Sequence, residues 1–88
     1  MKVKSDFILR KVAESYVVVP VNDLTVDFNG MINLNETGAF LFEILQNGAD
    51  KEKLVSRMLE EYEVTPEEAE TDITNFIQKL KDADVLEQ

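Results

Sequence analysis

The chain has 88 residues, with 18 acidic and nine basic side chains, no histidine, no cysteine and a formal net charge of −9. This charge repels the phosphates of nucleic acids and the headgroups of anionic membranes, and no apolar run reaches the roughly 20 residues of a membrane-spanning helix. The start, MKVKSDF, lacks the apolar stretch of a secretory signal. We therefore expect one soluble, cytoplasmic domain over residues 1–88 that binds neither nucleic acid nor membrane.

Two short segments near the start are rich in β-branched and aromatic residues. FILRKV (7–12) and SYVVVP (15–20) are separated by Ala13 and Glu14, a spacing that predicts an antiparallel hairpin. Asn29-Gly30 suits a type I′ turn and predicts a second hairpin over residues 26–34. Neither face of this second hairpin is purely polar, so it is either buried on both sides or borders a groove for an apolar ligand.

Capping residues then mark two helices. Asn35 can cap the first helix and Gly48 can end it; apolar residues surround most of this helix, which predicts a central position in the fold. Asp50 can cap the second helix, in which apolar residues recur at the 3.6-residue period. These residues are Leu54, Val55, Met58, Leu59 and Tyr62.

A third helix is predicted from Thr65 to about residue 82. Thr65 is a suitable N-cap, Pro66 suits the first helical position, and Glu68 is placed to close a capping box. Val85 and Leu86 should pack back on the core after the helix ends. Strands followed by three helices indicate an α+β domain of the winged helix-turn-helix type, with N-terminal antiparallel strands.

The candidate chemical motifs are weak. The residues at positions 1, 3, 5, 6 and 12 of a calcium-loop template are Thr25, Asp27, Asn29, Gly30 and Glu36, but the template requires a carboxylate at position 1. We interpret this segment as a turn and a helix cap. Since histidine and cysteine are absent and no glycine-rich phosphate loop is present, we expect no metal, no cofactor and no enzymatic activity.

The order of the segments resembles the PqqD-like family, the family of coenzyme PQQ synthesis protein D, over nearly the whole chain. The segments are FILRKV, YVVVP, VDFNGMINLNETGAFLFEIL, DKEKLVSRMLEEYEV and TPEEAETDITNFIQKLKDADVLE. The resemblance implies a peptide recognition element for ribosomally synthesised, post-translationally modified peptides. Such a chaperone presents a precursor peptide to a modifying enzyme, often a radical SAM protein. VNDLTVDF, between the second strand and Gly30, is longer than we expect of the PQQ-pathway members, so the resemblance implies peptide recognition and leaves a role in PQQ synthesis open.

The resemblance also implies a site, in which the leader of the precursor adds as a strand beside residues 31–34 and the third helix forms the wall. The implied peptide-binding residues are Met31, Ile32, Asn33, Leu34, Ile73, Phe76, Ile77 and Leu80. The alternative to peptide binding is that the side chains of the third helix are buried in the core, which applies more to Ile73 than to Phe76 and Ile77. If the Ile32 N–H faces the sheet edge, proline at that position should abolish binding.

Two other functions remain open from the sequence. A winged-helix DNA-binding module is suggested by fold analogy, although the net charge of −9 opposes it. A structural module could use a free sheet edge for dimerisation, which a concentration-independent monomer in sedimentation would exclude. We expect a monomer or a weak dimer, and a leader with basic residues to complement the acidic charge.

Overall fold

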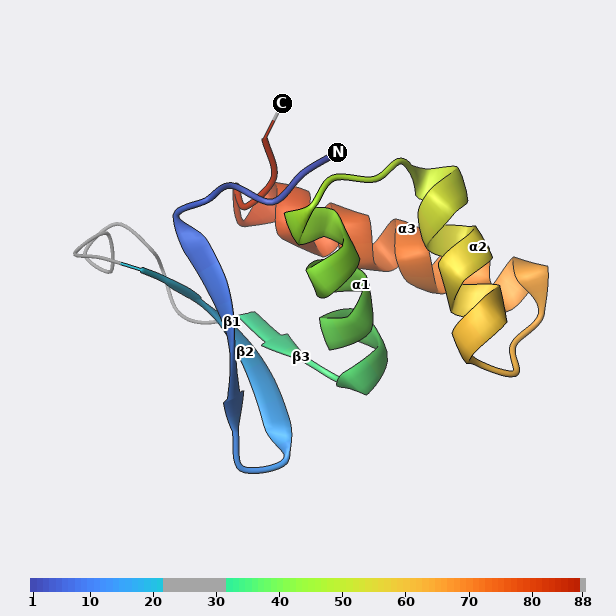
Figure 1. Cartoon of the computed structure of the whole chain (residues 1–88), viewed down its shortest axis with the longest axis horizontal. Helices are drawn as coiled ribbons and strands as arrows, with labels where there is room; N and C mark the ends of the chain where they lie inside the picture. Colours follow the sequence, from blue (N-terminus) through green and yellow to red (C-terminus); the bar gives the residue numbers. More distant parts are fainter. Residues whose placement is uncertain (22–31, 88) are drawn as a thin grey trace.

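The computed structural model describes residues 1–21 and 32–87, in which three strands precede three helices (Figure 1). The elements are β1 (Phe7–Val12), β2 (Ser15–Pro20), β3 (Ile32–Leu34), α1 (Glu36–Gln46), α2 (Lys51–Glu61) and α3 (Pro66–Asp82). The predicted α+β class is confirmed. In the view of Figure 1, α1 lies between the sheet and α2, and α3 passes behind α1. Within the described ranges, no helix is both long and apolar enough to cross a membrane.

Among the described strands the sheet order is β1-β2-β3, so β3 lies at one edge of the described sheet. The predicted first hairpin is confirmed, with a register that runs from Phe7 opposite Pro20 to Val12 opposite Ser15. Strand β3 pairs antiparallel with β2, with Ile32 opposite Val18. The Asn29-Gly30 turn of the predicted second hairpin lies outside the described residues.

All three predicted N-caps form. The Asn35 side chain accepts a hydrogen bond from Gly38 N at 2.8 Å, and the Asp50 side chain accepts one from Lys53 N at 2.8 Å. The Thr65 hydroxyl accepts from Glu68 N at 3.1 Å and donates to Glu68 Oε1 at 3.2 Å. Each cap satisfies a backbone donor of the first helical turn that has no partner within the helix.

One core joins every element. The side chains of Val18, Phe42, Leu54, Ile73 and Leu80 are completely buried, and they come from β2, α1, α2 and α3. The described part of the chain buries no polar or charged residue. Because apolar contacts alone fill this interior, the polar groups of the fold remain available at its surface.

The two ends of the described chain pair with each other, which the sequence analysis did not predict for residues 1–6. Val3 is buried and forms a β-bridge with Leu86, while its N–H donates to Leu45 O at 3.0 Å. Lys4 N donates to Val85 O at 2.8 Å. The predicted return of Val85 and Leu86 to the core is confirmed, with both residues buried beside the N-terminal segment.

We expect Asn35→Ala to lower the free energy of unfolding by about 1 kcal/mol, because the substitution removes the acceptor for Gly38 N. For a domain of this size the melting temperature should fall by roughly 4–8 °C. Thermal denaturation followed by circular dichroism measures both values. Asn35→Asp keeps an acceptor oxygen and should stay near wild type. Equal losses in the two variants would contradict the proposed role of the cap.

Candidate functional site

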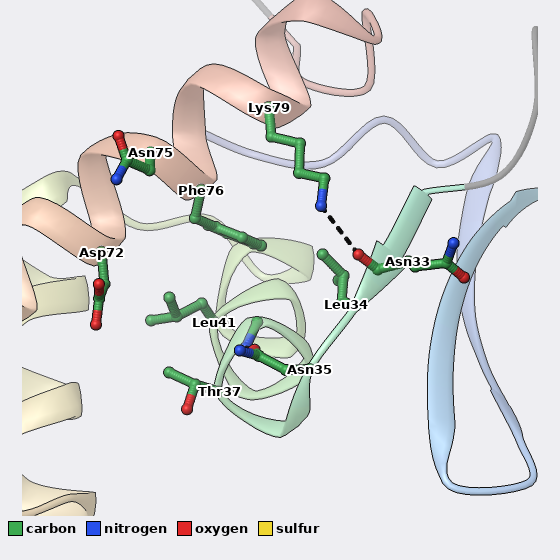
Figure 2. A pocket seen from close by; sticks show the side chains of 10 residues that line it. Asn33, Leu34, Asn35, Thr37, Leu41, Asp72, Asn75, Phe76 and Lys79 are labelled. Atoms are coloured by element: carbon green, nitrogen blue, oxygen red, sulfur yellow. Dashed lines mark hydrogen bonds between the residues drawn. The ribbon is translucent and has the colours of Figure 1, made fainter.

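A groove of about 450 Å³ lies between β3, the first turns of α1, and α3 (Figure 2). Ten residues line it: Asn33, Leu34, Asn35, Thr37, Gly38, Leu41, Asp72, Asn75, Phe76 and Lys79. The strand and α1 form one side and α3 forms the other. This volume falls within the range of pockets that bind small ligands or short peptide segments.

The hairpin turn decides which way the backbone of β3 faces. A two-residue turn closes with a hydrogen-bonded pair, here Val12 and Ser15, and hydrogen-bonded pairs then alternate along the strands. Val17 therefore bonds to β1, whereas its neighbour Val18 turns its backbone toward Ile32 of β3. By the same alternation, the backbone N–H and C=O of Asn33 point away from β2, toward a side where residues 1–21 and 32–87 place no further strand.

The contact between Lys79 and Asn33 agrees with this orientation. Lys79 Nζ on α3 donates a hydrogen bond to Asn33 O at 3.0 Å, as Figure 2 shows. Both residues are exposed, while the adjacent Ile32 and Leu34 are buried. One residue of β3 thus presents its backbone to the groove while the two beside it anchor the strand in the core.

One face of helix α3 lines the groove, and the adjacent face packs in the core. Asp72, Asn75, Phe76 and Lys79 follow the spacing i, i+3, i+4, i+7, which places them on one side of the helix, toward the groove. The adjacent face is fully buried in the core at Ala69, Ile73 and Leu80. Phe76 lies at the boundary, with 7% of its surface exposed. The groove wall is therefore polar at both ends and apolar at its centre.

Gly38 allows α1 to approach β3 closely. A Cβ atom at this position would lie 3.2 Å from Leu34 Cβ and 3.3 Å from Asn35 Oδ1, tighter than ordinary van der Waals contact. The glycine thus permits the sharp junction of strand and helix without displacing the Asn35 cap. Leu41, one turn further along α1, is 1% exposed and forms part of the apolar lining.

The implied peptide-binding residues divide into three groups. Asn33, Leu34 and Phe76 line the groove. Ile32, Ile73, Ile77 and Leu80 belong to the core cluster behind it. Met31 lies outside the described residues. The Ile32 N–H does not face the sheet edge, which was the condition for the predicted effect of proline at that position. The alternation directs this N–H toward β2, and the backbone of Asn33 points to the edge instead.

Sequence reasoning did not assign seven of the ten lining residues to the site. They are Asn35, Thr37, Gly38, Leu41, Asp72, Asn75 and Lys79. The available signal was the helical spacing of the polar residues around Phe76, which places them on one face of α3. The predicted residues of α3 follow its apolar stripe, and most of that stripe is buried in the core.

Few titratable side chains line the groove. It carries one carboxylate, Asp72, and one ammonium, Lys79. The pKa of Tyr62 is raised, first by burial and then by the Glu36 carboxylate, but Tyr62 does not line the groove. Residues 1–21 and 32–87 contain no group of three or more His, Cys, Asp or Glu side chains that could hold a metal ion. Residues 25–30 of the calcium template lie outside these ranges.

Comparison with known proteins agrees with the resemblance found in the sequence. The family model described as coenzyme PQQ synthesis protein D (PqqD) matches residues 8–86. The chain belongs to the PqqD family. No curated protein matches the chain.

Two solved structures share the fold of this PqqD family member. TbiB1, in complex with the TbiA(beta) leader peptide, superposes with a TM-score of 0.76 and 21% identity over 99% of this chain and 95% of that chain. Lasso peptide synthetase B1, complexed with the leader peptide, superposes with a TM-score of 0.70 and 21% identity over 92% of this chain and 89% of that chain. At this identity the similarity establishes the fold.

Proline substitutions test the orientation of β3. Ile32→Pro should lower the stability strongly, because it removes a ladder donor to β2 and a buried side chain. Asn33→Pro should cost clearly less, since its N–H faces the edge and its side chain is exposed. Urea denaturation of both variants measures the difference. A larger loss for Asn33→Pro than for Ile32→Pro would contradict the assigned orientation.

Proposed function

We propose that this protein is a non-catalytic recognition element that binds the leader of a ribosomally synthesised precursor peptide by strand addition at the edge of β3. The observation that carries the proposal is the outward-facing backbone of Asn33, set opposite α3 across a groove. Membership of the PqqD family supports it. So does the common fold with TbiB1 and lasso peptide synthetase B1, whose structures contain leader peptides.

Strand addition suits the dimensions of the groove. The three residues of β3 extend over about 10 Å at the usual rise of 3.3 Å per residue, enough to pair with a short extended segment. Backbone hydrogen bonds at the edge supply sequence-independent affinity, and side-chain pockets supply selectivity. Leu34 and Phe76, each 7% exposed, supply the apolar part of the groove surface that a side chain of the bound segment would contact.

We further propose that the bound precursor is presented to a separate maturation enzyme, of the radical SAM class in keeping with the family resemblance. The leader would be held at β3 and α3 while the rest of the precursor extends away from the domain. In this arrangement the protein supplies binding and orientation, and the chemistry takes place on the partner.

The DNA-binding alternative has little support from α3. The helix carries five carboxylates (Glu67, Glu68, Glu70, Asp72 and Asp82) and two lysines (Lys79 and Lys81), all exposed. A recognition helix in the major groove would bring these carboxylates close to phosphates. Self-pairing through the outward side of β1 or β3 remains an outcome of the binding test below.

We expect Asn33→Pro to weaken peptide binding at least five-fold, because one edge hydrogen bond is lost and the proline ring obstructs the approaching strand. The probes are 15-residue synthetic peptides that cover the short open reading frames beside the gene, titrated by calorimetry and by amide shifts. Lys11→Pro is the matched control. By the same alternation the Lys11 N–H faces the outer side of β1, at the other edge of the sheet.

The expected result is that Lys11→Pro binds like wild type and that amide shifts occur in β3 and α3 together. Shifts restricted to β1 or α2 would exclude the proposed groove. A wild-type protein that binds none of the peptides and sediments as a concentration-dependent dimer would favour the self-pairing alternative.

A further inference from the structure

Lys79 occupies a backbone acceptor that a bound strand needs. Its Nζ lies 3.0 Å from Asn33 O, the carbonyl that points away from β2 at the edge of the described sheet. A strand added at this edge must direct one of its own N–H groups at the same carbonyl. In the free protein the lysine therefore satisfies this carbonyl, which makes the carbonyl less available to an unrelated strand.

Strand addition changes the surroundings of the ammonium. The incoming N–H shares Asn33 O with the ammonium or displaces it, and the peptide covers part of the groove that Lys79 lines. An ammonium that loses a hydrogen-bond partner and part of its hydration is unfavourable unless a new partner replaces them. A carboxylate on the peptide is the partner with the best charge and geometry.

The groove can accept this carboxylate at one end only. Asp72 and Lys79 lie seven residues apart on α3, which is about 10 Å along the helix axis. An acidic side chain is repelled near Asp72 and attracted near Lys79. The remainder of the peptide meets a protein of net charge −9, which favours basic residues elsewhere in the leader.

We propose that Lys79 is a specificity-determining residue that selects an acidic side chain in the bound peptide, within one or two residues of the N–H that bonds to Asn33 O. This inference rests on the proposed function and adds the class of residue that the site recognises. In the free protein Lys79 donates a hydrogen bond to Asn33 O, and in the complex it forms an ion pair with the acidic side chain of the peptide.

The test is a selection from a library of random 12-residue peptides displayed on phage, with wild type, Lys79→Glu and Lys81→Glu as immobilised targets. Lys81→Glu is the matched control, because it makes the same charge change two residues along the same helix, and Lys81 is exposed but does not line the groove. Wild type and Lys81→Glu should enrich Asp or Glu at one fixed position relative to the apolar residues. Lys79→Glu should enrich Lys or Arg at that position.

A second measurement covers the case in which a charge reversal perturbs the fold. The best wild-type peptide is compared with its Glu→Gln or Asp→Asn counterpart, on wild type and on Lys79→Met. The neutral peptide should bind wild type about five-fold more weakly, which is the upper range for a partly exposed ion pair. On Lys79→Met the two peptides should bind equally.

The outcomes separate the two proposals. Peptides that bind in the groove with the same acidic preference on wild type and Lys79→Glu, or with no acidic preference on wild type, would overturn the role of Lys79 and leave strand addition intact. Enrichment of no peptide on any of the three targets would overturn the proposed function, and the role of Lys79 with it.

Discussion

The period-two alternation of β3 is the constraint on which the rest of the site depends. Ile32 and Leu34 are drawn into the core, which fixes Asn33 outward, and the hairpin register of β1 and β2 directs the Asn33 backbone away from β2. A slip of one residue would bury Asn33 and expose two apolar side chains. Burial of Ile32 and Leu34 therefore also maintains the hydrogen-bonding groups that the groove presents.

On the opposite side of the groove, α3 also combines core residues with groove residues. Helix α3 carries its core residues and its groove residues on adjacent faces, so the contacts that stabilise the helix also set its distance from β3. The core residues Ile73 and Leu80 fix the position of the helix, and Asn75 and Lys79 supply polar groups to the groove. Phe76 belongs to both sets, so truncation of this side chain would affect folding and the groove surface together.

Sequence reasoning predicted the elements better than the site. The helix starts could be predicted from the caps Asn35, Asp50 and Thr65, because a cap is a local interaction between residues close in the chain. The bridge between Val3 and Leu86 joins segments more than 80 positions apart in the numbering, and no local pattern reports it. For the site, apolar periodicity cannot separate a side chain that fills the core from one that lines a groove.

An edge that binds peptides must also avoid binding the wrong ones. Backbone pairing is nearly independent of sequence, so an open edge is a hazard for aggregation as much as a means of recognition. Here the exposed part of the edge is short, and the ammonium of Lys79 already occupies the carbonyl of Asn33. In the proposed binding mode, an incoming N–H must share this carbonyl with the ammonium or displace it, so backbone pairing at Asn33 contributes less than it would at a carbonyl without a donor. In that mode the affinity would depend mainly on the side-chain contacts in the groove, which would make a sequence-independent interaction selective.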